Sequence, residues 1–91
     1  MYRCKHCTYA DYQRLVNTTE AYLSNLKEND FDQNDLDNYL YFISDYDDDI
    51  SVEIRFRLSK ANKDKATVER VIREQMKILY NTVLVDIREH N

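Results

Sequence analysis

The chain has 91 residues and a formal net charge of −4; 43% of its residues are hydrophobic and 33% are charged, and it contains neither glycine nor proline. At average usage, a chain of this length holds about 11 of the two together. Phosphate-binding loops, dinucleotide-binding turns, GxSxG nucleophile elbows and EF-hand loops all need glycine, so its absence excludes these motifs. Length and composition indicate one globular domain over residues 1–91.

The sequence carries no signal for a membrane or for secretion. No run approaches the roughly 18 apolar residues that a membrane span needs. The opening stretch, MYRCKHCTYADY, lacks an apolar core of the kind found in signal peptides. Two cysteines without a signal peptide are typical of a reducing compartment, which predicts a cytoplasmic location, the host cytoplasm for a phage-encoded chain.

A short N-terminal segment, residues 1–8, precedes a predicted helix over 9–28. Thr8 and Asp11 have the spacing of a capping box, with Asp in place of Glu. Apolar and aromatic residues then recur at i, i+3, i+4 and i+7. They are Tyr12, Leu15, Val16, Thr19, Tyr22, Leu23 and Leu26.

Residues 38–58 predict an acidic β-hairpin. Residues 38–44 fit a strand by composition, although Leu36, Tyr39, Leu40 and Ile43 also form a helical stripe. The strand is favoured because residues 50–58, ISVEIRFRL, alternate between apolar and polar and offer it a partner. The turn between them is built from Asp45–Asp49, where other chains use glycine.

A second long helix is predicted over residues 64–82. Residues 83–87 are open, because they are β-branched enough for a terminal strand and equally compatible with a longer helix. The order α-β-β-α, with or without a last strand, predicts an α+β fold in which helices pack on one face of a short antiparallel sheet.

Charge is segregated along the chain. Residues 28–54 hold ten acidic residues and no Lys or Arg, while the flanks carry a net charge of +6. Part of this acidity serves turns and helix starts, where Asp caps backbone groups. What exceeds that need predicts a negative surface for a basic partner.

The cysteines and the acidic turn both contain residue types that bind metal ions. Cys4 and Cys7 have the spacing of half a zinc site, but a closed site needs four ligands, and His90 is the remaining histidine outside that motif. The default expectation is two free cysteines and no cofactor. The EF-hand pattern fails in both registers that the acidic residues allow, and the positions of the two histidines favour no catalytic role.

These observations predict a small non-catalytic inhibitor that mimics nucleic acid and binds a basic nucleic-acid-handling protein, such as a nuclease or a guide-RNA effector. Its acidic tract, short α+β order and lack of enzymatic motifs resemble, in general format, phage-encoded inhibitors of bacterial defence, the anti-CRISPR proteins among them. The predicted partner-binding residues are Asp30, Asp32, Asp35, Asp37, Tyr41, Asp45, Tyr46, Asp47, Asp48, Asp49 and Glu53.

Three alternatives stay open. The same chemistry suits an immunity protein or antitoxin that neutralises a nuclease. A nucleic-acid-binding regulator would use Arg55 and Arg57 on the wet face of the 50–58 strand, although nearby carboxylates disfavour direct contact with phosphate. An assembly protein would dimerise through an apolar face, and both a monomer and a homodimer are compatible with the composition.

Overall fold

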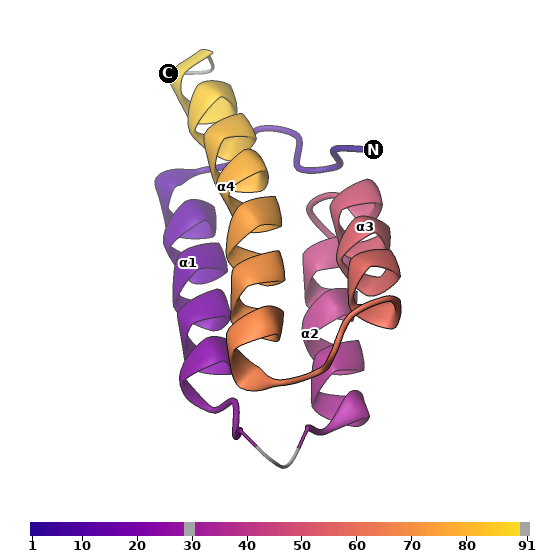
Figure 1. The fold of residues 1–91 in the computed structure, drawn as a ribbon. Helices are drawn as coiled ribbons and strands as arrows, with labels where there is room; N and C mark the ends of the chain where they lie inside the picture. Colours follow the sequence, from indigo (N-terminus) through magenta and orange to yellow (C-terminus); the bar gives the residue numbers. More distant parts are fainter. Residues whose placement is uncertain (29–30, 90–91) are drawn as a thin grey trace.

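The computed structural model of the chain describes residues 1–28 and 31–89, and each regular element in this part is a helix. The helices are α1 (Tyr9–Ser24), α2 (Gln33–Ser44), α3 (Asp48–Ser59) and α4 (Lys65–Glu89), and they run alternately in opposite directions (Figure 1). The predicted α+β fold is therefore wrong. In the described residues, pairing of the β type is confined to one isolated bridge between Tyr2 and Asp47.

The segment predicted as the first strand of the hairpin is helix α2. Its buried residues are Leu36, Tyr39, Leu40 and Ile43, which is the helical stripe that competed with the strand interpretation. A half-buried strand would send neighbours such as Tyr39 and Leu40 to opposite faces of a sheet, but both are buried here, as one face of a helix allows. Burial spacing, rather than β propensity, decides the element.

The segment predicted as the second strand is helix α3. Alternation by two contains a spacing of four, and Ile50, Ile54 and Leu58 use that spacing to bury one helical face. Val52 belongs to the same alternating set but is 64% exposed. The alternating pattern therefore predicted burial correctly for three of its five apolar residues and wrongly for Val52 and Phe56, which are exposed.

Helices begin on Asp and Thr side chains instead of glycine-containing turns. Thr8 and Asp11 form the predicted capping box of α1. Asp32 and Asp47 accept hydrogen bonds from backbone N–H groups at the starts of α2 and α3. Asp64 accepts a hydrogen bond from the backbone N–H of Thr67, at 2.8 Å, at the start of α4. Each such cap contributes about 1 kcal/mol.

The long helix α4 lies between α1 and α3, while α2 packs mainly on α3 and least on α1 (Figure 1). Helix α4 continues to Glu89, so residues 83–87, which the sequence left open, are helical. Helix α1 ends at Ser24, before the predicted boundary at 28. The fully buried large side chains come from each helix. They are Leu15, Leu36, Leu40, Ile43, Ile54, Leu58, Val68, Ile72, Met76, Leu79 and Val83.

The N-terminal segment, residues 1–8, crosses one end of the bundle and joins the start of α3 to the last turns of α4 (Figure 1). The backbone N–H of Arg3 donates to the carbonyl of Tyr46 at 2.7 Å. Asp86 Oδ2 accepts the backbone N–H of Cys7 at 3.1 Å. This segment therefore brings the cysteines and the acidic start of α3 to the same end of the molecule.

Candidate functional site

The acidic tract occupies α2 and the first half of α3, and its carboxylates fall into two groups. One group, at the start of α3, comprises Asp47, Asp48 and Asp49. The other lies on and beside α2, and includes Asp35, Asp37 and Asp45. The two groups differ in what their oxygens already contact.

The carboxylates at the start of α3 are committed to contacts within the chain. Asp47 caps α3, and Asp48 accepts hydrogen bonds from the Met1 ammonium at 2.6 Å and from Arg3 at 2.7 Å. Asp49 also forms an ion pair with the Met1 ammonium. The hydrogen bonds from the ammonium and from Arg3 lower the pKa of Asp48 to about 2. Much of the negative charge predicted to meet a partner here is neutralised by the chain itself.

The two tyrosines predicted to contact a partner lie in opposite environments. Tyr46 is 7% exposed and packs edge-on against Phe42, with 5.4 Å between ring centroids. Tyr41 is 76% exposed on α2. Tyr46 therefore belongs to the core, and Tyr41 is the aromatic side chain that α2 presents to solvent.

Tyr41 lies at the middle of an exposed stripe that we call the α2 ridge. At helical spacing, the ridge consists of Asn34, Asp37, Asn38, Tyr41 and Asp45. Asp37 and Asp45 lie one turn to either side of the tyrosine. The guanidinium of Arg55, from α3, donates to Asp37 at 2.7 Å and lowers the pKa of that carboxyl.

Two hollows flank the ridge. The larger, about 590 Å³, opens between α1 and α2, and the smaller, about 470 Å³, lies on the α3 side. Asn38 lines both, which places it on the crest between them. The larger hollow follows from the loose packing of α1 against α2. It has a basic side, with Arg14 and Lys27, and an acidic side, with Asp32 and Asp35.

The wall of the larger hollow contains residues that the sequence assigned to the core. Tyr22 and Tyr39 stack there, with ring centroids 4.6 Å apart and planes within 8°. Burial raises the pKa of Tyr22 to about 12. Arg14 lies over the ring of Phe42 at 5.6 Å. No local pattern in the sequence indicates the Tyr22–Tyr39 pair, because the two residues lie on different helices.

The remaining predicted contact residues contribute less to one surface. Glu53 forms an ion pair with Arg57 one turn along α3, at 3.8 Å. Asp30 lies outside the described residues. Because residues 50–58 are helical, Arg55 and Arg57 do not share the face of a strand, and the described residues contain no two-stranded ribbon of the kind that a regulator would insert into a DNA groove.

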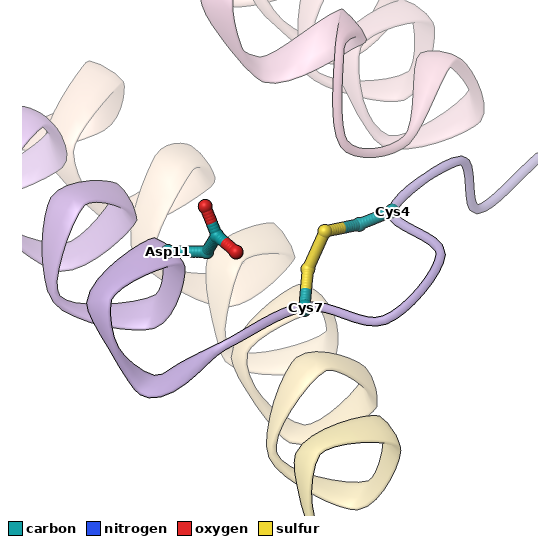
Figure 2. A group of neighbouring side chains, drawn as sticks. All are labelled: Cys4, Cys7 and Asp11. Atoms are coloured by element: carbon teal, nitrogen blue, oxygen red, sulfur yellow. A yellow bond between two sulfur atoms is a disulfide. The ribbon is translucent and has the colours of Figure 1, made fainter. Parts of the chain in front are cut away.

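The cysteines are not free thiols as expected. A disulfide joins Cys4 and Cys7, with 5.6 Å between their Cα atoms, and the carboxylate of Asp11 projects toward it from the first turn of α1 (Figure 2). The Sγ atoms and a carboxylate oxygen of Asp11 all lie within 4.8 Å of one another. His90, the further zinc ligand that the sequence offers, lies outside the described residues. The cytoplasmic prediction loses its argument from unpaired cysteines.

Comparison of the chain with family models, with curated proteins and with solved structures found no match. Among the described helices, the 25-residue α4 included, none has a stretch apolar enough to span a lipid bilayer.

Proposed function

We propose that this chain is a small non-catalytic binding protein that inhibits a basic nucleic-acid-handling protein, and that the α2 ridge is its contact surface. The observation that carries the proposal is the exposure of Tyr41, 76%, between Asp37 and Asp45 on a helix without Lys or Arg. Large aromatic side chains at this exposure cost free energy in water, and tyrosines of this kind are enriched among residues that dominate binding energy.

The exposed carboxylates on and beside the ridge favour a basic partner. Asp45, on the ridge, and Asp35, in the wall of the larger hollow beside it, are exposed, and the ion pairs found within the described residues include neither of them. Both are therefore available to pair with Arg or Lys of a partner. An arginine can also stack on the face of the Tyr41 ring. These features match a basic groove that ordinarily receives phosphates, which is where a nucleic-acid mimic acts.

Shape supports the same surface. A helix with a hollow on each side can enter a groove in a partner, and the walls of that groove then fill the hollows beside the helix. The hollow on the α1 side offers stacked aromatic rings, and the hollow on the α3 side offers Ser44, Ser51 and Arg55. A central anchor with a polar rim is the arrangement expected of a protein interface.

The test is affinity capture from the native host with the wild-type chain and with Tyr41→Ala, followed by binding measurements on the purified captured protein. We expect Tyr41→Ala to weaken binding by about 30-fold, which corresponds to roughly 2 kcal/mol for a dominant interface residue. Tyr9→Ala is the matched control, since Tyr9 is 58% exposed at the start of α1 and lines neither of the two hollows. Equal binding by the two variants would contradict the proposed surface.

A second comparison tests the charge. Replacing Asp35 and Asp45 with Asn should slow association and flatten its dependence on salt, because both residues attract a basic partner at long range. Asp49→Asn is the control, since the Met1 ammonium already pairs with Asp49. Tight binding of the wild-type chain to duplex DNA, falling steeply with salt, would exclude the mimic.

A further inference from the structure

The two sulfur atoms of Cys4 and Cys7 lie close to the carboxylate of Asp11, outside the α2 ridge. Together they form a group of atoms that could hold a metal ion once the disulfide is reduced. Two sulfur atoms and a carboxylate oxygen lie within 4.8 Å of one another at the start of α1 (Figure 2). Thiolates and carboxylates are both ligands of Zn²⁺. The cluster joins a turn to a helix, so its three donors come from two rigidly connected pieces of chain.

The turn between the cysteines is shaped to hold both sulfurs on one side. His6 has a left-handed backbone, with φ of 61°, and this allows the chain to reverse within the four residues Cys4–Cys7. The Cα atoms of the two cysteines are 5.6 Å apart, a separation within the range of about 4.4–6.8 Å that a disulfide accepts. After reduction, Cys4, which is half-buried, can rotate to open a position between the sulfurs.

Hydrogen bonds already orient the carboxylate donor. Oδ2 of Asp11 accepts the backbone N–H of Thr8 at 2.8 Å and its hydroxyl at 3.0 Å, and these bonds hold the carboxylate beside the cysteines. On the other side, the backbone N–H of Cys7 donates to Asp86 at 3.1 Å. Partners of this kind, which hold a ligand in place without touching the metal, are common around metal ions in proteins.

We infer that the reduced chain binds Zn²⁺ through Cys4 Sγ, Cys7 Sγ and a carboxylate oxygen of Asp11, with a water molecule as the fourth ligand. The cation offsets most of the charge of two thiolates and one carboxylate.

The exchange between the two states balances as follows. A dithiol reductant supplies two electrons and two protons, the Cys4–Cys7 bond breaks, and the reductant leaves as its own disulfide. Zn²⁺ then displaces the two thiol protons into solvent and forms two Zn–S bonds. Either the disulfide or the metal closes the turn at residues 4–7. The N-terminal segment therefore keeps its position across the end of the bundle in oxidising and in reducing surroundings.

The experiment uses the full chain, reduced with a phosphine that is itself oxidised to the phosphine oxide with oxygen from water. Co²⁺ is added first, as a spectroscopic probe, and Zn²⁺ then competes with it against a chromophoric chelator. We expect one Co²⁺ per chain, thiolate-to-cobalt charge-transfer absorption, ligand-field bands of a tetrahedral site, and displacement by Zn²⁺. Absence of these bands in the reduced chain would overturn the assignment.

Variants separate this site from adventitious binding. Cys4→Ser should abolish the charge-transfer absorption, and circular dichroism checks that the variant stays helical. Asp11→Asn should keep that absorption but weaken Zn²⁺ binding about tenfold or more, a loss in the range found even for outer-shell partners. Asp45→Asn, a carboxylate on α2, should change neither. Equal Zn²⁺ affinity of Asp11→Asn and the wild-type chain would remove Asp11 from the site, and equal binding by the oxidised chain would place the metal elsewhere.

Discussion

The start of α3 and the outer face of α2 come from one acidic stretch of sequence, yet the fold uses their carboxylates differently. At the start of α3, Asp47 caps the helix and Asp48 holds the N-terminal segment through the Met1 ammonium and Arg3. Along α2, Asp45 faces solvent beside Tyr41. Dense negative charge is therefore a guide to a binding surface only after the carboxylates used by backbone caps and ion pairs have been subtracted.

The largest expected effect on stability tests whether residues 50–58 form helix α3. Ile54→Ala should lower the free energy of unfolding by about 2–5 kcal/mol, because Ile54 is fully buried. Val52→Ala should change it by less than about 0.5 kcal/mol, as for other surface sites. Urea denaturation of both variants measures the difference. Similar losses for the two would restore the alternating strand and remove the distinction between the two acidic groups.

The next effect separates an architectural carboxylate from an exposed one. Asp47→Ala should cost about 1 kcal/mol, since two backbone N–H groups at the start of α3 lose their acceptor. Asp45→Ala, two residues earlier, should cost less than about 0.5 kcal/mol. Thermal unfolding monitors both, and a cost of 1 kcal/mol shifts the midpoint by roughly 4–8 °C in a domain of this size. If Asp45→Ala proved the more destabilising, the roles assigned to the two groups would be reversed.

A smaller effect tests the one ridge carboxylate that the chain does pair. A double-mutant cycle on Asp37 and Arg55 should give a coupling of about 0.2–1 kcal/mol in stability, the usual size for exposed ion pairs. Arg55→Met should also free the charge of Asp37 and strengthen binding to a basic partner. Weaker binding by Arg55→Met would show that the partner prefers the neutralised ridge.

The smallest effect is in the pH dependence at the start of α3. The pKa of Asp48 falls from 3.8 to about 2 on folding, so its contribution to stability is present above pH 3.8 and is lost as the pH falls to about 2. Carboxyl chemical shifts followed by NMR should show Asp48 titrating near the lower value. Asp48→Asn should make stability less dependent on pH in this acid range, and an unchanged profile would contradict the ion pairs at Asp48.

Sequence patterns predicted the helices where one periodicity stood alone. The stripe from Tyr12 to Leu26 and the Thr8–Asp11 capping box located α1, and the second long stripe located α4. Prediction failed over 38–58, where two periodicities coexisted. β propensity at Tyr39–Ile43 and the alternation from Ile50 to Leu58 each suggested a strand, and each segment also contained a spacing of four that the helix uses.

The candidate site was predicted only in part. Tyr41 is exposed, as a contact residue must be, but Tyr46 is buried, and no local pattern distinguishes two tyrosines in one acidic stretch. The stacked pair Tyr22 and Tyr39 joins residues from α1 and α2, and the Asp37–Arg55 ion pair joins α2 to α3. Partners this far apart along the chain become neighbours only when the helices pack.

The sequence alone determined which motifs are excluded and where α1 starts, because both depend on residue type and on contacts within one turn. A chain without glycine or proline begins its helices on Asp and Thr, and that consequence is local. The tertiary structure decided which acidic residues remain on the surface and which donors surround the cysteines. Those outcomes depend on how four amphipathic helices share one core, and a helix reveals its solvent-facing residues only after its neighbours have covered the rest.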